Sequence, residues 1–405
     1  MEDFNSRKVV PEFLVKIMNV VFTRRIWEND LAKEGGFDRL LALSGAIEVD
    51  FLSLELPLNF KSNANYRLIF KLRNKERIYL LKLFWIPYQL RTILVDNLFY
   101  SLVLLIAFVV DKGRINLFSV DLGVIPIITI LKKLRFQTKI WFHIADYTPA
   151  NRFQNKLLNK LHLNSLKQAT HFSDIITVPN LKIFQALESD LNADPSRIII
   201  LRNLPVCQEL TTIKPIKDFG QFKVVIATSE VDQKFLILET LKAFRKVEKE
   251  FRFYFLIMGA ISDQKYFEAL NKYALDQKNF EIEFTGLVSR SVATTKMNGM
   301  DLGVAIYSDK TGYTEYCESL KIWQYTQLGL AVIGSDFVSP MNLIHESGSG
   351  WKVSNPDEIS KIIESIDRID LMSRKNNSLK FFKHQQNLEE NSISRFKSRF
   401  NEIFV

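Results

Sequence analysis

Residues 318–336 run Glu318-Ser-Leu-Lys-Ile-Trp-Gln-Tyr-Thr-Gln-Leu-Gly-Leu-Ala-Val-Ile-Gly-Ser-Asp336, which predicts a helix followed by a strand. Ser319 is a residue type that caps helices, and Gly329 can end the helix in a left-handed conformation. Lys321 falls in the first helical turn, with Gln324 one turn further along. Such a helix amino terminus favours a phosphate group, because its N–H groups, its dipole and the lysine all attract negative charge. The alternative is an ordinary surface helix that merely begins at Ser319.

Outward from this segment, apolar runs alternate with longer helical patterns in both halves of the chain, and residues 203–220 separate the halves. In the first half the expected strands are 17–22, 47–52, 117–120, 139–143, 175–178 and 198–201. In the second half they are 224–227, 253–258, 281–285, 302–306 and 331–334. This alternation predicts an α/β protein with two Rossmann-like domains that face each other across a cleft. Ligands of such sheets bind outside the carboxyl ends of the strands, so the cleft is the expected site.

Composition excludes several classes of protein. The 405 residues are 47% hydrophobic and 24% charged, which excludes a disordered chain and suits two domains of about 200 residues each. Two cysteines, Cys207 and Cys317, cannot form a disulfide framework, and the five histidines show no zinc-type spacing. The apolar run 98–110 is too short to span a bilayer and predicts a buried helix. The opening Met-Glu-Asp-Phe lacks the regions of a signal peptide, so we expect a cytoplasmic setting.

The net charge of +9 comes entirely from the first half of the chain. Residues 1–205 hold 28 Lys and Arg against 19 Asp and Glu, whereas residues 206–405 hold 26 against 26. In residues 59–91, eight basic side chains and the single acid Glu76 are interleaved with aromatic residues. Such a segment suits an anionic membrane surface. The alternative is a solvated helix face above a core. Nucleic acid is not an expected partner, because no zinc finger, RNP motif or recognition-helix unit is present.

The 318–336 segment resembles the nucleotide-sugar-binding segment of GT-B-fold glycosyltransferases of the group 1 superfamily, with Lys321 and Gly329 in the family's register. Other family-like stretches follow in order: Phe284-Thr-Gly-Leu-Val-Ser-Arg290, Met300-Asp-Leu-Gly-Val-Ala-Ile-Tyr307 and Gly348-Ser-Gly-Trp-Lys-Val-Ser-Asn-Pro-Asp357. Upstream, Phe172-Ser-Asp-Ile-Ile-Thr-Val-Pro179 and Ile200-Leu-Arg-Asn-Leu204 are similar to the acceptor domain and its exit. The resemblance covers about residues 115–366 and depends on the ordered series.

The resemblance implies a division of the chain. Residues 1–205 would form an N-terminal acceptor-binding Rossmann-like domain, and residues 223–372 a C-terminal nucleotide-sugar-binding domain. Residues 206–222 would link the two domains. Residues 373–405 would form helices that cross back to the N-terminal domain.

The resemblance also implies a donor site. Lys321 would neutralise the diphosphate, Gln324 would bind the ribose, and Leu320 would pack near the nucleotide, with Ser319 at the start of the same helix. The base and sugar pocket would be lined by Tyr307 and by the backbone of Gly286 and Leu287.

Two departures from the family pattern narrow this expectation. Gln324 stands where many retaining members carry a ribose-binding glutamate, and Tyr316 stands where a second glutamate precedes it. The Ser-Leu-Lys-x-x-Gln arrangement is similar instead to inverting glucuronosyltransferases of the xanthan type. The arginine usual after the first donor-domain strand is absent. Lys234 would take over its contact with the diphosphate, or would be an ordinary surface lysine.

Inverting transfer needs a general base for the acceptor hydroxyl. Asp146 follows the predicted strand in Trp141-Phe-His-Ile-Ala-Asp-Tyr-Thr-Pro149, where an aspartate serves as the base in similar enzymes. The alternative is an aspartate that caps the turn. His143 is interpreted as a core histidine. No Asp-x-Asp motif occurs, so neither a metal nor another cofactor is expected, and Lys321 with helix dipoles would meet the charge of the leaving group.

These features predict a metal-independent hexosyl or glycuronosyl transferase. It would move a sugar from a nucleotide diphosphate sugar, expected to be a UDP-sugar, to a glycan or lipid-linked glycan acceptor in bacterial-type polysaccharide synthesis. Residues 59–91 would hold it at the cytoplasmic face of the cell membrane. The alternatives are a nucleotide-sugar epimerase of the same fold and a catalytically inactive, nucleotide-binding scaffold subunit. No Gly-x-Gly-x-x-Gly follows an expected strand, which disfavours a dinucleotide-dependent dehydrogenase.

Overall fold

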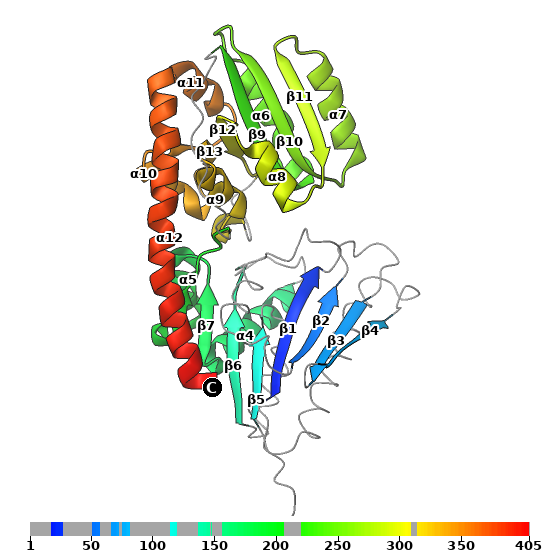
Figure 1. Ribbon diagram of the computed structural model, residues 1–405, viewed down its shortest axis with the longest axis vertical. Helices are drawn as coiled ribbons and strands as arrows, with labels where there is room; N and C mark the ends of the chain where they lie inside the picture. The colour runs from blue at the N-terminus through cyan, green and yellow to red at the C-terminus, as the bar shows by residue number, and fades with distance from the viewer. Residues whose placement is uncertain are drawn as a thin grey trace, which may run out of the picture.

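The structure is a computed structural model that describes residues 18–26, 51–56, 66–72, 75–81, 114–119, 137–145, 147, 156–205, 220–308 and 314–404. In Figure 1 two α/β units lie one above the other, and a long helix runs along one side of both. We call the unit with strands β1–β8 the N-terminal unit and the unit with strands β9–β14 the C-terminal unit.

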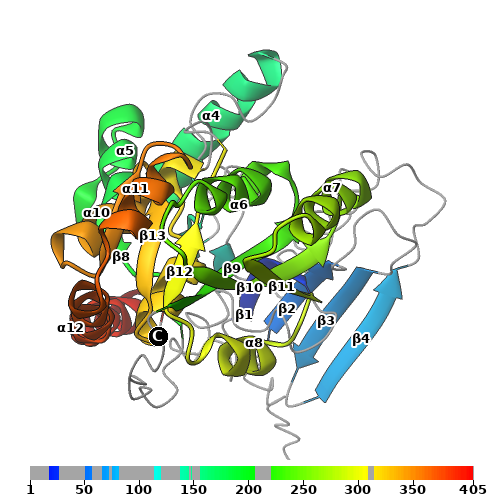
Figure 2. The ribbon, with the colours of Figure 1, turned by 90° about the horizontal axis from the view of Figure 1, so that it is seen from above.

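The C-terminal unit has a six-stranded sheet in the order β11-β10-β9-β12-β13-β14, and every neighbouring pair is parallel. Its strands are β9 (Gln221–Val231), β10 (Arg252–Ile261), β11 (Phe280–Gly286), β12 (Leu302–Ala305), β13 (Ala331–Ser335) and β14 (Gly350–Val353). Its helices are α6 (Ile237–Arg245), α7 (Gln264–Leu275), α8 (Arg290–Met297), α9 (Leu320–Gln327), α10 (Ser339–Glu346) and α11 (Glu358–Ser365). In Figure 2 helices α6 and α7 lie on one face of this sheet and α8 on the other. The strand order reverses between β9 and β12, which marks the switch point where such sheets bind ligands.

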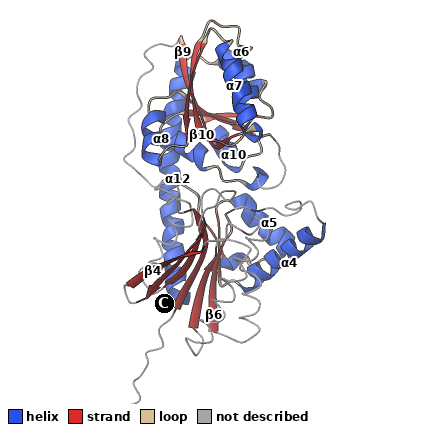
Figure 3. Ribbon diagram, turned by 90° about the vertical axis from the view of Figure 1, so that its right-hand side faces the viewer, coloured by secondary structure: helices blue, strands red, loops and turns tan. Residues whose placement is uncertain are grey.

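The N-terminal unit has an eight-stranded sheet in the order β4-β3-β2-β1-β5-β6-β7-β8. Its strands are β1 (Met18–Ile26), β2 (Phe51–Leu56), β3 (Tyr66–Leu72), β4 (Lys75–Leu81), β5 (Arg114–Ser119), β6 (Gln137–His143), β7 (Ile175–Val178) and β8 (Ile198–Ile200). All neighbours are parallel except β2–β3 and β3–β4, which are antiparallel. Helices α4 (Lys156–Phe172) and α5 (Leu181–Leu191) cover one face of the sheet (Figure 3).

Most expected strands lie where the apolar runs placed them, but two stretches differ. The expected strand 47–52 overlaps β2 only at Phe51 and Leu52. Within 59–91, the described residues form the antiparallel strands β3 and β4, so the interpretation as a helix face is wrong there. The apolar run 98–110 lies outside the described residues. The domain boundaries expected from the sequence stay a prediction.

At β6 and β7 both faces of the N-terminal sheet are covered, as alternate strand residues show. Trp141 and Ile175 face a cluster that includes Phe400. Their neighbours Phe142 and Ile176 pack instead with helices α4 and α5. This alternation is the two-residue period of a strand, with apolar partners on each side.

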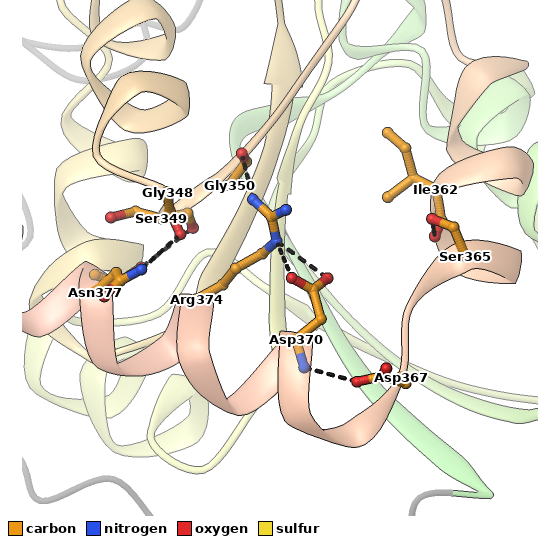
Figure 4. Close-up of polar contacts among 10 residues, drawn as sticks. Gly348, Ser349, Gly350, Ile362, Ser365, Asp367, Asp370, Arg374 and Asn377 are labelled. Carbon is orange, nitrogen blue, oxygen red and sulfur yellow. Dashed lines mark hydrogen bonds and ion pairs between the residues drawn. The ribbon is translucent and has the colours of Figure 1, made fainter.

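Helix α12 (Arg368–Phe404) is a single 37-residue helix that packs against both units. Near its start, Arg374 binds Asp370 and donates to the Gly350 carbonyl oxygen at 3.1 Å (Figure 4). The Arg374 guanidinium also stacks on the Trp351 ring at 4.0 Å. Further along, Ser378 donates to the Leu330 carbonyl oxygen at 2.7 Å.

The far end of α12 packs on the N-terminal unit, where the rings of Phe396, Phe400 and Phe404 contact Phe118 and Trp141. One helix therefore contributes to both cores.

Among the described residues, no helix combines the length and the apolarity needed to cross a bilayer.

Candidate functional site

A pocket of about 330 Å³ opens at the carboxyl ends of β9, β10 and β11, beside the first turns of α8 and α9. Five of the residues predicted for the donor site line it: Gly286, Leu287, Leu320, Lys321 and Gln324. Sequence reasoning assigned no role to the other lining residues, which are Ala227, Thr228, Met258, Gly259, Val288, Arg290, Ala293 and Met297. The pocket therefore lies at the end of the sheet where ligands of parallel sheets bind.

Glycines let the strand ends form this wall. Gly259 has a φ of +152°, and a Cβ atom there would lie 2.5 Å from Thr228 Oγ1. Thr228 Oγ1 in turn donates to the Met258 carbonyl oxygen at 3.1 Å, which ties the end of β9 to β10. Gly286, which ends β11, has a φ of +65°, a left-handed conformation that favours glycine. The pocket wall thus leaves no room for a side chain at Gly259 and favours glycine at Gly286.

Helix α9 is fixed to the sheet by Tyr325, which is fully buried. The Ala227 N–H donates to Tyr325 Oη at 2.8 Å at the end of β9. Gly303 in β12 makes room for the ring, because a Cβ atom there would lie 2.3 Å from it. Helix α9 is therefore fixed by contacts on both sides of the switch point.

Lys321 brings a partly buried cation to the pocket. Its Nζ lies 4.7 Å from the centre of the Phe235 ring, and Lys234 Nζ lies 5.3 Å from the same centre. Burial lowers the pKa of Lys321 to about 8; the charge of Lys234 lowers it further, whereas Cys317 and Asp232 oppose the shift. Among the described residues, no carboxylate forms an ion pair with Lys321. A bound anion would supply the missing counter-charge.

Lys234 has carboxylate partners of its own. Its Nζ lies 3.0 Å from Asp232 and 3.5 Å from Glu230, and its side chain is 42% exposed. It is not among the residues that line the pocket. Lys234 and Lys321 both lie near the Phe235 ring. Lys234 is therefore next to the pocket but is not part of its lining.

Ser319 and Tyr307 lie beneath the start of α9 rather than in the pocket wall, and both are buried. Ser319 stands at the N-cap position, but its hydroxyl makes no cap bond and lies 3.1 Å from Tyr307 Oη. The expected side-chain cap is therefore wrong. The Tyr307 N–H donates to Ser335 Oγ at 3.0 Å, and its ring packs on Phe235. The pair thus supports the turn from which Lys321 projects.

Arg290 is the lining residue that carries a second positive charge. It is the first residue of α8, after the N-cap Ser289, and burial lowers the pKa of its guanidinium. The sequence predicts the strand 281–285 before it, and Ser289, a residue type that caps helices, is a signal from which a helix start at Arg290 could have been predicted. The position of Arg290 near Lys321 has no local signal, because it depends on how β11 and β12 are placed in the sheet.

The turn before α9 contacts the N-terminal unit. Asn180, the N-cap of α5, donates to the Tyr316 carbonyl oxygen at 3.0 Å. The Tyr316 ring packs edge-on against Tyr147 at 5.0 Å. Lys182 and Glu315 form an ion pair at 3.1 Å. Asp146 lies outside the described residues, but its neighbour Tyr147 lies at this contact.

His143 is a core residue, as interpreted from the sequence. It is buried, and its Nδ1 lies 2.9 Å from Thr177 Oγ1. Burial lowers its pKa to about 4, so the imidazole is neutral at physiological pH. In the described part of the chain, no group of three or more His, Cys, Asp or Glu side chains could hold a metal ion.

A larger hollow of about 580 Å³ lies near the carboxyl ends of α4 and α5, with Lys167, His171 and Arg197 in its wall. Arg197 Nη1 donates there to the carbonyl oxygens of His171 and Ser173, which are structural contacts. None of the residues predicted for the donor site lines this hollow.

Solved structures match the chain in fold, whereas no protein-family model and no curated protein matches it. The E. coli trehalose-6-phosphate structure bound with UDP-2-fluoro glucose has a TM-score of 0.64 at 12% identity, covering 95% of this chain and 98% of its own. An α,α-trehalose-phosphate synthase (UDP-forming) from Burkholderia vietnamiensis has a TM-score of 0.62 at 12% identity, covering 96% and 99%. HepE from Anabaena in complex with UDP has a TM-score of 0.53 at 12% identity, covering 70% and 78%. The expected GT-B fold is confirmed.

Proposed function

We propose that the protein is a glycosyltransferase that moves a sugar from a UDP-sugar to a glycan or lipid-linked glycan acceptor. The observation that carries this proposal is the pocket at the switch point, where Lys321, Gln324 and the first turn of α9 meet. Lys321 has no ion-pair partner among the described residues, and Ser319 leaves the first turn of α9 without a side-chain cap. The matching structures that contain UDP or UDP-2-fluoro glucose support a nucleotide diphosphate as the ligand.

On the donor side, the leaving group is the nucleotide diphosphate. Its oxygens gain charge as the bond to the sugar breaks, and stabilising that charge lowers the barrier. Lys321 and the amino terminus of α9 provide positive charge in a partly dehydrated pocket, where it acts more strongly than in water. Gln324, one turn along α9, would hold the ribose hydroxyls, since an amide both donates and accepts.

On the acceptor side, Asp146 would act as the general base. It would take the proton from the acceptor hydroxyl while that oxygen attacks the anomeric carbon and the diphosphate leaves from the opposite face. Inversion of configuration follows from this single displacement. The contact between Tyr147 and Tyr316 supports the role, because it places the neighbour of Asp146 beside the turn that leads to α9.

The acceptor, and the location of the protein at the membrane, are proposed from the sequence alone. A lipid-linked glycan of polysaccharide synthesis would be met at the inner membrane face, and the basic, aromatic segment 59–91 would attract anionic lipids. Binding to anionic liposomes should fall as salt screens the charges. Indifference to liposomes at low salt would remove the membrane part of the proposal and leave the transferase intact.

The first test is calorimetric titration with UDP, GDP, ADP and CMP. We expect saturable binding of UDP that Lys321→Ala weakens by at least tenfold. Lys272→Ala is the matched control, because Lys272 is an exposed lysine on α7, outside the pocket. If the folded protein binds none of the four nucleotides, the donor site is wrong and the proposed function fails.

The second test separates a transferase from an epimerase or an inactive scaffold. Asp146→Asn should retain UDP binding and lose transfer by about 10²- to 10⁴-fold, the usual contribution of a general base. The measurement is UDP release from UDP-sugars with and without candidate acceptors. Turnover of the donor without any acceptor, unchanged in this variant, would favour the epimerase.

A further inference from the structure

Glu318 is a buried carboxylate in the turn immediately before α9, and its side chain is 1% exposed. Its Oε1 accepts from Trp323 Nε1 at 2.9 Å and lies 3.5 Å from Arg202 Nη1. Its Oε2 is buried without a hydrogen-bond partner among the described residues. One oxygen is therefore hydrogen-bonded, whereas the other is buried without a hydrogen bond.

Groups from four segments of the chain surround this carboxyl group. Trp323 belongs to α9, and the side chains of Asn180 at the start of α5 and Ser339 in α10 also face it. Arg202, in the segment that leaves β8, stacks on the Trp323 ring at 5.7 Å. The Arg202 N–H donates to Glu389 Oε2 of α12 at 3.0 Å, so that second carboxylate lies behind the arginine.

Stability does not explain a carboxylate here. Moving a charged group from water into a protein interior costs several kcal/mol, and a buried oxygen without a partner calls for an explanation. Glutamine has nearly the same shape, and its carbonyl oxygen can also accept from Trp323 without the desolvation cost of a charge. Burial raises the pKa of Glu318 to about 7 despite the opposing effects of Arg202, Trp323, Asn180 and Ser339.

The location indicates what the charge does. Arg202 lies at the exit of the N-terminal sheet, and Glu318 lies three residues before Lys321. Their attraction joins the first turn of the donor-site helix to the other unit. When the carboxyl group is protonated, this attraction is lost while the apolar contacts of Trp323 with Leu204 and Phe382 remain.

We propose that Glu318 is a positioning residue whose ionised form, paired with Arg202, holds the phosphate-binding end of α9 in its binding position. The inference rests on the proposed function, because it makes nucleotide affinity depend on this pair. Protonation would release the pair and weaken the nucleotide site.

The test is calorimetric titration of UDP between pH 6 and pH 8 on the wild type, Glu318→Gln and Arg202→Met. If only the ionised form binds well, apparent affinity rises up to about tenfold over this range, because it scales with the competent fraction. Glu318→Gln should bind at all pH values about as weakly as the wild type does at pH 6, apart from the ionisation of UDP itself and of Lys321, whose pKa is about 8. Arg202→Met should bind UDP as weakly as Glu318→Gln does. Glu346→Gln, which removes an exposed carboxylate from α10, is the control and should behave as the wild type.

Thermal unfolding separates positioning from simple structural support. For a carboxyl group with a raised folded-state pKa, stability falls as pH rises towards and through that pKa, so Glu318→Gln should melt no lower than the wild type at pH 8. A variant that melts lower and loses the same factor in affinity at every pH would show a structural role only. Wild-type affinity and pH dependence in Glu318→Gln would also overturn the proposal.

Hydrogen exchange of α9 without nucleotide keeps the two proposals distinguishable. After correction for intrinsic rates, protection of residues 320–327 should fall from pH 8 to pH 6 in the wild type and stay constant in Glu318→Gln. If UDP does not bind but this difference is seen, the proposed function fails and the coupling stands. If UDP binds and the difference is absent, the coupling fails and the proposed function stands.

Discussion

At the scale of single residues, the donor pocket contains a cation that its surroundings do not neutralise. Lys321 is partly buried, lies on the Phe235 ring and has a pKa lowered to about 8. Burying an unpaired charge costs stability, and a ligand of opposite charge recovers that cost on binding. A partly buried, unpaired charge with a shifted pKa is typical of functional sites. Such a group is kept because it binds the ligand, although it lowers the stability of the protein without ligand.

Replacing Lys321 by methionine should therefore have opposite effects on stability and on binding. The folded-state pKa lies below the ordinary value of lysine, so the wild type gains stability as pH rises from about 8 to about 10.5. Lys321→Met removes the cost, and we expect a gain of about 1 kcal/mol at pH 7 that shrinks as pH rises above the folded-state pKa of about 8 and is gone near the ordinary lysine pKa of about 10.5. Urea unfolding at pH 7 and pH 9.5, with UDP calorimetry, measures both effects. A less stable variant at pH 7 would contradict this account.

The Phe235 ring should contribute to the same site through its contacts with Lys321 and Lys234. A cation over an aromatic ring gains about 0.5–2 kcal/mol, depending on how well it is shielded from water. Phe235→Leu keeps the apolar volume and removes that attraction, so UDP affinity should fall about threefold to tenfold. Phe267→Leu is the control, because Phe267 packs on Phe284 away from both lysines. Equal effects of the two substitutions would assign the loss to general packing.

At the scale of elements, the sequence revealed those whose signals are local. The segment from Ser319 to Gly329 has a cap residue, a helical pattern and a glycine with a φ of +67°, and α9 lies there. Central parallel strands are buried on both faces, so they appear as apolar runs that are easily recognised. The antiparallel strands β3 and β4 lack that continuous run, and the four-residue β14 (Gly350–Val353) is short, so they were not anticipated.

The same distinction explains how much of the candidate site could be predicted. Lys321 and Gln324 belong to one recognisable helix. Thr228, Gly259 and Arg290 come from three segments that the sheet brings together, and nothing local marks them as neighbours. The N-cap position of Ser319 was predicted correctly, but the hydrogen-bond partner of its hydroxyl was not. That partner is Tyr307, which lies in the loop after β12.

Among the elements, α12 is attached to the C-terminal sheet by a buried ion pair. Lys375 Nζ lies 2.8 Å from Asp301 Oδ1, and the two side chains are 5% and 9% exposed. Lys375→Met would leave that aspartate buried without its partner, at a cost of about 3–5 kcal/mol. Urea unfolding should show this loss, and Asp301→Asn in the same chain should recover part of it. The exposed Lys380→Met on the same helix is the control; equal losses in both variants would contradict the assignment.

At the scale of the whole molecule, α12 makes one cooperative structure of two units. Its first half binds the C-terminal sheet through Lys375 and Ser378, and its last turns pack Phe400 among Phe118 and Trp141 of the N-terminal unit. Unfolding either unit would expose part of this helix, so the two units should melt in a single transition.

Phe400→Ala opens a cavity in the N-terminal unit and should lower the free energy of unfolding by about 3–5 kcal/mol while the transition stays single. UDP, which would bind only the C-terminal unit, should nevertheless move the whole transition upward. Calorimetric scans with and without UDP measure this, with Leu388→Ala as the control because Leu388 is 46% exposed on the same helix. Two transitions, of which UDP moves only one, would show that α12 does not couple the two units. The contact between Glu318 and Arg202 would then be the one to examine for coupling between the N-terminal and C-terminal units.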